Sequence, residues 1–175
     1  STYTQMLNKA GGIETDLTVI CIEESHFRII SAATTRTHDK AHILKHLSPK
    51  LELNDITDEL VCLGIFGPKS RSLISKISKD NFSNDNLNFG RGKYTQIGSR
   101  KVWVQRLSYV GELGFEIYIN NIDAKEIYEL IIKEGKNYKL SHCGSHAMDT
   151  MRMESGFLHW GHDISPEENQ YEAGL

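Results

Sequence analysis

Two acids in the sequence lie where chemistry could use them, and the first is Asp16. It falls in residues 11–19, GGIETDLTV, where two glycines predict a turn and an apolar strand follows. An Asp at such a place either caps the turn through backbone hydrogen bonds or is held as a rigid carboxylate at a strand end. The second arrangement would suit proton transfer in a cleft. Both interpretations of Asp16 remain open on these residues alone.

The second acid is Glu116, in residues 106–119, RLSYVGELGFEIYI. Two apolar arms flank V-G-E-L-G, whose glycines favour a turn, so we predict a hairpin centred on Glu112 and Leu113. That register sets Tyr109 opposite Glu116, with both side chains on one face. A carboxylate between apolar strand neighbours either faces solvent or, if covered, needs donors such as the adjacent N–H groups of a pterin or guanine-like ring.

A third polar group follows in residues 147–164, AMDTMRMESGFLHWGHDI. Asp149 and Arg152 are three residues apart on an expected helix and should pair on one face. Four histidines in and before this segment raise the possibility of a metal site: His142, His146, His159 and His162. They lack the H-E-x-x-H pattern and have no Cys or carboxylate at ligand spacing, so we predict no metal ligands.

The elements that must position these residues alternate irregularly, and the hairpins are local. This pattern predicts an α+β fold with antiparallel sheets and packed helices rather than a doubly wound parallel sheet. No G-x-G-x-x-G follows a predicted strand, so no dinucleotide-binding fingerprint is expected. We predict strands at residues 3–8, 17–23, 26–31, 60–66, 93–97, 101–107 and 115–119, and helices at 35–47, 69–78, 123–134 and 145–155.

The composition limits the class of protein. The chain has 175 residues, a 39% hydrophobic fraction and a formal net charge of -3, which suits one globular domain and predicts neither a nucleic acid nor a membrane partner. No signal peptide is recognised at the start. The three widely spaced cysteines predict free thiols in a reducing compartment, so we expect a cytoplasmic location, or the mitochondrial matrix if the source is eukaryotic.

Four segments together resemble one family. They are YTQMLNKAGGIETDLTV, GPKSRSLI, RLSYVGELGFEIYI and AMDTMRMESGFLHWGHDISPEENQYEAGL, in that order. They are similar to the folate-binding region shared by glycine-cleavage T-proteins (aminomethyltransferases) and by dimethylglycine and sarcosine dehydrogenases or oxidases, and HWGHDI resembles the dehydrogenase branch more. The resemblance implies the central part of the T-protein-like folate-binding fold. It makes residues 1–175 a partial domain, with the flavin domain and the C-terminal barrel not present.

The resemblance also implies a function. Its cofactor would be tetrahydrofolate, which captures a one-carbon unit from a methylated amine as 5,10-methylenetetrahydrofolate, while FAD would belong to a flavin domain in the same polypeptide. Asp16 matches the family's catalytic acid. Tyr109 and Glu116 match residues that line the pterin, and Thr18 matches a position that can contact folate in the oxidase branch.

Two departures from the family pattern affect the site. Thr15 stands where many relatives have a second acid, so Asp16 would act alone, and Met148 stands where T-proteins have an Arg. Two other functions remain open: a free aminomethyltransferase acting on a protein-bound lipoyl amine, or a non-catalytic folate-family relative that binds a partner or a different small molecule.

Overall fold

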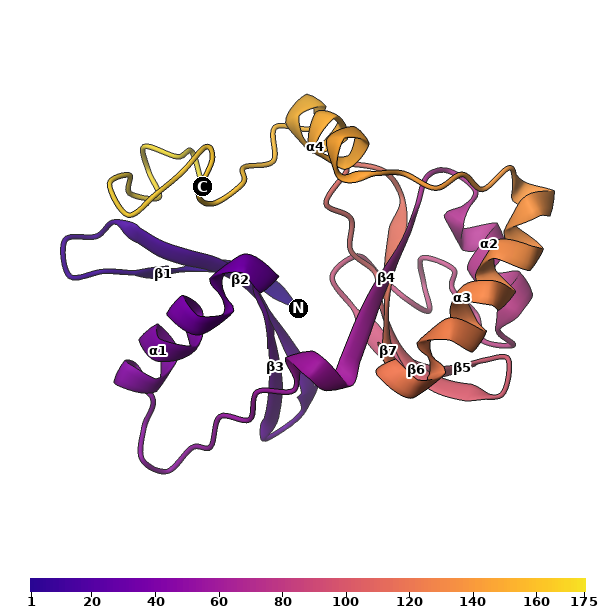
Figure 1. The fold of residues 1–175 in the computed structure, drawn as a ribbon, viewed down its shortest axis with the longest axis horizontal. Coiled ribbons are helices and arrows are strands. Elements are labelled where there is room, and N and C mark those ends of the chain that lie inside the picture. The colour runs from indigo at the N-terminus through magenta and orange to yellow at the C-terminus, as the bar shows by residue number, and fades with distance from the viewer. The chain divides into compact units, whose positions relative to one another are not determined.

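Two antiparallel sheets organise the computed structural model, which describes residues 1–175 (Figure 1). They belong to two separate units of the chain. Unit 1 consists of Ser1–Asp55 and Leu158–Leu175, and unit 2 consists of Ile56–Phe157. Helices and antiparallel sheets occur in both units, so the predicted α+β class is confirmed.

Unit 1 is built on a three-stranded sheet in the order β1-β2-β3. The strands are β1 (Thr2–Leu7), β2 (Ile13–Glu23) and β3 (His26–Ile30), and the short helix η1 (Ala33–Thr35) leads into α1 (Arg36–His46). The end of the chain returns to β2, because the Ile13 N–H donates to the Glu168 carbonyl over 2.9 Å. The Trp160 indole N–H donates to the Ile13 carbonyl, also over 2.9 Å.

Helix α1 is anchored by a buried acid. The apolar spacing in residues 35–47 predicts a helix, and α1 forms there, with Asp39 as its only buried residue and Leu44 exposed. The Thr35 hydroxyl donates to Asp39 over 2.7 Å, and His38 contacts its other oxygen at 3.1 Å. Burial alone would raise the pKa of Asp39, but these bonds and others from Ser31 and Thr15 outweigh it and lower the pKa.

Unit 2 contains a four-stranded sheet in the order β4-β7-β6-β5. Its strands are β4 (Leu60–Phe66), β5 (Gly92–Ile97), β6 (Arg100–Gln105) and β7 (Gly114–Asn120). Helices α2 (Ser70–Ile77) and α3 (Asn121–Gly135) pack together and against β7 (Figure 1). The short helix η2 (Thr57–Glu59) precedes β4, η3 (Lys136–Tyr138) follows α3, and α4 (Ser145–Glu154) comes last.

The apolar core of unit 2 lies between the sheet and these helices. Alternate residues of β7 supply its centre, since Phe115, Ile117 and Ile119 are each 0% exposed. Leu73 and Ile74 of α2 meet them from the helix side. The strand period of two therefore sends Glu116 and Tyr118 to the opposite face of the same sheet.

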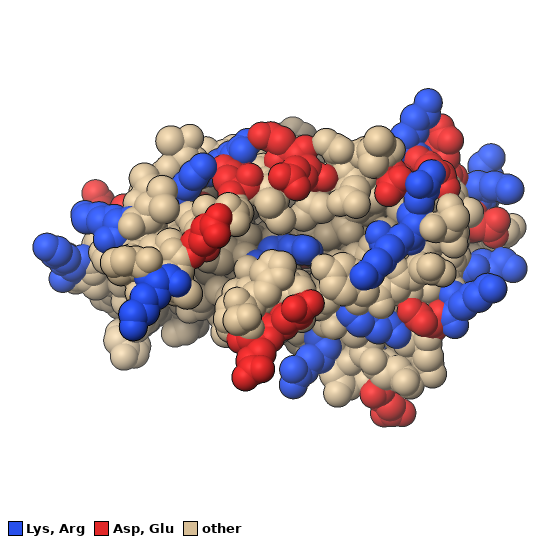
Figure 2. All heavy atoms as spheres, turned by 90° about the horizontal axis from the view of Figure 1, so that it is seen from below, with Lys and Arg blue, Asp and Glu red and all other residues tan.

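The surface carries both signs of charge. Figure 2 shows acidic and basic side chains interspersed on the face in view, in keeping with the formal net charge of -3. None of the helices has the length and the apolar character required to cross a membrane. Cys21, Cys62 and Cys143 are free thiols.

Candidate functional site

Asp16 lies within strand β2 of unit 1, not in the glycine turn. Asn8, and not Asp16, caps the turn. Its side-chain oxygen accepts hydrogen bonds from the N–H groups of Ala10 and Gly12, each over 2.9 Å. Asp16 pairs across the sheet with Gln5 of β1. The turn-capping interpretation of Asp16 is therefore wrong, because Asn8 already satisfies the backbone of the turn.

A tyrosine on the neighbouring strand holds the Asp16 carboxylate. The Tyr3 hydroxyl donates to Asp16 Oδ2 over 2.9 Å. Burial raises the pKa of Asp16, while the hydrogen bond from Tyr3 opposes this in part. Thr18 lies two residues further on the same strand and pairs with Tyr3, so Asp16, Thr18 and Tyr3 share one face of this sheet.

Glu116 lies on β7 of unit 2, on the face turned away from the core. Its neighbours across the sheet are Gly64 on β4 and Gln105 on β6. The Tyr118 hydroxyl donates to Glu116 Oε2 over 2.5 Å. Burial raises the pKa of Glu116, and the Tyr118 hydrogen bond counters part of that rise. The carboxylate therefore sits in partly desolvated surroundings rather than in open solvent.

Tyr109 does not lie opposite Glu116, so the predicted hairpin register is wrong. Strand β6 ends at Gln105, which takes that position, and residues 106–113 form an irregular loop. The reason lies in competing partners for the loop's backbone. At the start of the loop the Arg106 N–H donates to the Arg91 carbonyl, and at its end the Leu113 carbonyl accepts from the Gly67 N–H and the Ser70 hydroxyl.

The Tyr109 ring is instead stacked on Phe157, with ring centroids 6.4 Å apart and an interplanar angle of 18°. Gly111, at a φ of +74°, brings the loop against Ser155, where a side chain at residue 111 would collide with the Ser155 hydroxyl. The Ser155 hydroxyl in turn bonds the Val110 carbonyl over 3.3 Å. Tyr109 is thereby fixed by contacts with the end of α4.

The structure thus groups the predicted site residues by unit. Asp16 and Thr18 share a face in unit 1, whereas Tyr109 and Glu116 belong to unit 2 and occupy a loop and a strand. Their convergence in one cavity stays a prediction. Tyr3 and Tyr118 were not singled out by the sequence, although the strand period of two already places Tyr118 on the face of Glu116.

Other polar groups have structural roles. Arg152 pairs with Asp149 at 2.7 Å, as the helical spacing predicts, and also donates to the Phe157 carbonyl over 2.9 Å. The histidines do not gather, since no group of three or more His, Cys, Asp or Glu side chains is placed to hold a metal ion.

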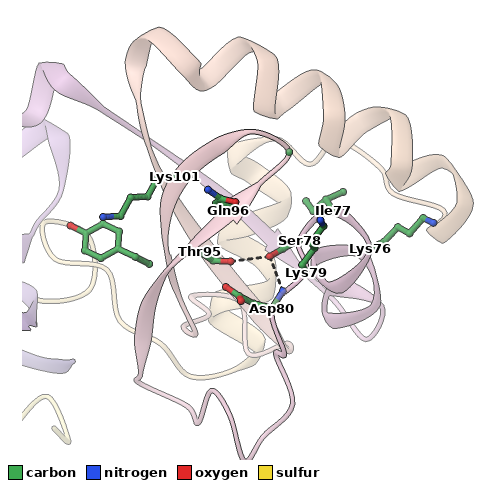
Figure 3. Close-up of a pocket in the computed structure, with 10 residues that line it drawn as sticks. Lys76, Ile77, Ser78, Lys79, Asp80, Thr95, Gln96 and Lys101 are labelled. Atoms are coloured by element: carbon green, nitrogen blue, oxygen red, sulfur yellow. Dashed lines mark hydrogen bonds between the residues drawn. The ribbon is translucent and has the colours of Figure 1, made fainter.

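A cavity of about 630 Å³ in unit 2 contains none of the predicted site residues (Figure 3). It lies beside the end of α2 and strand β5, where the Ser78 and Thr95 hydroxyls are 2.8 Å apart. The Lys76 and Lys101 side chains point away from each other, so they do not converge on a common anion (Figure 3).

The fold and the site define an α+β protein with two antiparallel sheets. On each sheet, a tyrosine hydroxyl holds one carboxylate. The chain matches the model of the GCVT N-terminal domain over residues 1–175, and it belongs to that family. It is therefore an aminomethyltransferase-like domain of the kind that T-proteins share with dimethylglycine and sarcosine dehydrogenases.

Relatives of two kinds resemble the chain. The 4-methylaminobutanoate oxidase (formaldehyde-forming) of Paenarthrobacter nicotinovorans is 34% identical over 99% of this chain and 21% of its own length. Human mitochondrial dimethylglycine dehydrogenase is 31% identical over 98% of the chain and 20% of its own length. The aminomethyltransferase of Thermoanaerobacter pseudethanolicus is 34% identical over 99% of the chain and 47% of its own length. The chain therefore spans a fifth to a half of these relatives.

Solved structures agree on the fold. The glycine cleavage system aminomethyltransferase T from Bartonella henselae superposes with a TM-score of 0.80 at 25% identity, over 96% of this chain and 44% of that protein. The heterotetrameric sarcosine oxidase from Corynebacterium sp. U-96 gives a TM-score of 0.57 at 15% identity and covers 80% of this chain and 72% of its own. The predicted T-protein-like fold is confirmed by the first of these.

Proposed function

We propose that the chain is the tetrahydrofolate-dependent one-carbon transfer part of a dimethylglycine or sarcosine dehydrogenase-like enzyme. In this proposal the methyl-derived carbon of a methylated amine is captured as 5,10-methylenetetrahydrofolate. Residues 1–175 form part of the folate-binding domain, and an FAD-containing domain elsewhere in the polypeptide oxidises the amine. The family membership and the dehydrogenase and oxidase relatives support this assignment.

The observation that carries the proposal is the partial burial of the Glu116 carboxylate and its hydrogen bond from Tyr118. Its Oε2 accepts the Tyr118 hydroxyl, which leaves Oε1 as the oxygen that a ligand could engage. A partly buried carboxylate is costly unless donors satisfy it, so this oxygen suits a ligand that brings N–H groups. The pterin edge of tetrahydrofolate carries such groups, and charge-assisted hydrogen bonds to a carboxylate are strong and directional. The residues present therefore fit the ligand.

Asp16 and the remaining residues complete the proposed roles. Tetrahydrofolate supplies the nitrogen nucleophiles when it is bound. Asp16 accepts or returns the proton that ring closure requires, and the Tyr3 hydrogen bond fixes its orientation while the raised pKa brings its proton affinity closer to neutral pH. Thr18 offers a hydroxyl on the same strand face, and Tyr109 offers an aromatic ring and a hydroxyl.

The test compares two products in the full-length protein. Asp16→Asn should leave amine oxidation intact and reduce the formation of 5,10-methylenetetrahydrofolate by about 10²- to 10⁴-fold, the usual contribution of a positioned acid or base. The control is Glu24→Gln, an exposed acid in the turn after β2, which should change neither rate. Undiminished folate product in Asp16→Asn would remove Asp16 from the mechanism.

A free aminomethyltransferase is the second candidate, because an aminomethyltransferase relative is as similar to the chain as the oxidase is. The absorbance of the purified full-length protein separates the two. Bound flavin and consumption of a methylated amine favour the dehydrogenase, whereas a flavin-free protein that acts on a lipoyl-bound amine favours the aminomethyltransferase. Calorimetry that detects no tetrahydrofolate binding would leave only a non-catalytic binding module.

A further inference from the structure

The outer face of β7 carries Glu116 and Tyr118, and Tyr118 has no role so far in the proposed chemistry. The Tyr118 hydroxyl donates to Glu116, two residues away on the same strand face. On β4, Cys62 lies directly opposite Tyr118, and it contributes to the raised pKa of that hydroxyl. The order Cys62–Tyr118–Glu116 thus connects an edge strand to the carboxylate expected to bind the pterin.

Apolar groups lie beside this half-buried carboxylate. Phe66 lies over Gly64 and Gly114, where any added side chain would collide with its ring. Gly64 is the residue opposite Glu116, so the ring lies next to the carboxylate on this face. Such surroundings favour the neutral acid, and a neutral carboxylic acid offers fewer acceptor sites to N–H donors.

The Tyr118 hydroxyl is the group that opposes this effect. Burial has the largest effect on the pKa of Glu116 and raises it, whereas the Tyr118 hydrogen bond lowers it. The pKa of Tyr118 is itself raised by burial and by the nearby Glu116 charge, so the phenol stays a donor throughout the physiological range. The other facing residues are Cys62 and Gly64 on β4 and Trp103 and Gln105 on β6, and only Cys62 among them titrates.

We propose that Tyr118 is a positioning residue for folate binding: its hydroxyl fixes Glu116 Oε2 and keeps the carboxylate ionised, so that Oε1 is directed at the N–H donors of the pterin. The inference rests on the proposed function, because it assumes that Glu116 is the pterin-binding acid. Tyr118 acts only through Glu116 and needs no contact with the ligand.

The experiment uses the full-length protein and two readouts. The first is the titration of the Glu116 carboxyl group without ligand, followed by carbon NMR and assigned with Glu116→Gln. The second is the dissociation constant of 5-formyltetrahydrofolate, an air-stable probe, between pH 5 and pH 8. Tyr118→Phe should raise the midpoint of the Glu116 titration by about one pH unit, since a hydrogen bond to a charged group has this strength. The pH below which probe binding weakens should rise by the same amount, and below that pH the dissociation constant should be about tenfold larger than in the unmodified protein.

Tyr94→Phe is the matched control, because Tyr94 lies on strand β5 of the same sheet and no bond joins its hydroxyl to Glu116. It should leave both readouts unchanged, and any titration of the probe itself is common to all variants. A second variant places 3-fluorotyrosine at position 118. This stronger donor should shift both readouts in the opposite direction, and it answers the question even if Tyr118→Phe does not fold.

The outcomes separate the inference from the proposed function. Parallel shifts of the Glu116 titration and of probe binding support the positioning role. A Glu116 titration that Tyr118→Phe leaves unmoved overturns it, as does a moved titration with unchanged probe binding. If the unmodified protein binds neither the probe nor tetrahydrofolate, the proposed function itself fails and the inference falls with it.

Discussion

In unit 1, Asp16 is carried by a three-stranded sheet with few buried apolar residues, whereas in unit 2 Glu116 is carried by a sheet backed by an extensive core. Asp39, Thr15 and His38 stabilise the packing of α1 in unit 1 through hydrogen bonds. The helices of unit 2 are held by apolar contacts among Leu73, Ile117 and their neighbours. Polar networks depend on protonation and apolar packing does not, so the two units should respond differently to pH and to truncation.

The largest expected effect is in the core of unit 2. Ile117→Ala should lower the free energy of unfolding of this unit by about 2–5 kcal/mol, because Ile117 is 0% exposed and a cavity would remain. Urea denaturation measures the change. Ile122→Ala is the control, since Ile122 is 87% exposed and its removal should cost less than about 0.5 kcal/mol. Equal losses in both variants would contradict an apolar basis for this unit.

The next effect concerns the acid in α1. Asp39→Asn should destabilise unit 1 by about 1–3 kcal/mol, because Asp39 is 2% exposed and its donors would lose a charged acceptor. The pKa of Asp39 is lowered from 3.8 in the folded state. Its contribution is therefore present above that value and lost as the pH falls through the folded pKa.

Stability measured between pH 2 and pH 6 checks this assignment. The wild type should lose stability on the acid side, and Asp39→Asn should show a smaller acid-induced loss. A variant whose acid dependence matches that of the wild type would show that Asp39 is not the titrating group.

A smaller effect is expected at His38. One ring nitrogen lies 3.0 Å from Glu14 and the other 3.1 Å from Asp39, and the ring stacks on Trp160 with centroids 5.8 Å apart. A neutral imidazole donates at only one nitrogen, so the two carboxylates favour the imidazolium. The hydrogen bond to Asp39 is the main reason that the pKa of His38 is raised.

The contribution of His38 is complete below the unfolded value of 6.5 and is lost as the pH rises through the folded pKa. Thermal melting from pH 6 to pH 9 should therefore show a decline in stability that His38→Gln reduces. His42→Gln changes a histidine of the same helix that contacts His46 instead of a carboxylate, and it should retain the decline. The same decline in both variants would rule out His38.

The smallest effect is chemical rather than energetic. Although Cys62 is an exposed residue, partial desolvation of its thiol and the Glu116 charge raise its pKa to about 12, so little thiolate is present at pH 8. Iodoacetamide should label Cys62 at least about tenfold more slowly than an ordinary free thiol, as peptide mass spectrometry over time would show. Labelling at the ordinary rate would mean that the Cys62 thiol does not experience the surroundings of Glu116.

The sequence predicts those elements in which local preference and packing agree. The strand expected at residues 60–66 has the observed bounds of β4, and the four helices fall within a few residues of their predictions. Gly156, at a φ of +72°, ends the helical segment as its position predicts. Apolar runs and glycine caps are local signals, so a single sequence is enough to find them.

The errors occur where distant partners decide the outcome. The register of Glu116 depends on distant partners of the loop, such as the Arg91 carbonyl that accepts the Arg106 N–H, and no local pattern shows this. Asp16 is freed from the glycine turn because Asn8 caps it. The burial of Asp39 in α1 likewise depends on hydrogen bonds from residues outside the helix, which no local pattern shows.

Unit 1 is assembled from Ser1–Asp55 and Leu158–Leu175, so it cannot be completed until unit 2 has been synthesised. Strand β2 receives hydrogen bonds from Trp160 and contributes one to Glu168, both of which leave the ribosome long after it. Unit 2 is contiguous and can fold while translation continues. The start of β2 therefore lacks these two hydrogen bonds until residues 160–168 emerge. During that interval the unbonded backbone groups of Ile13 are open to chaperones or to mispairing with another nascent chain.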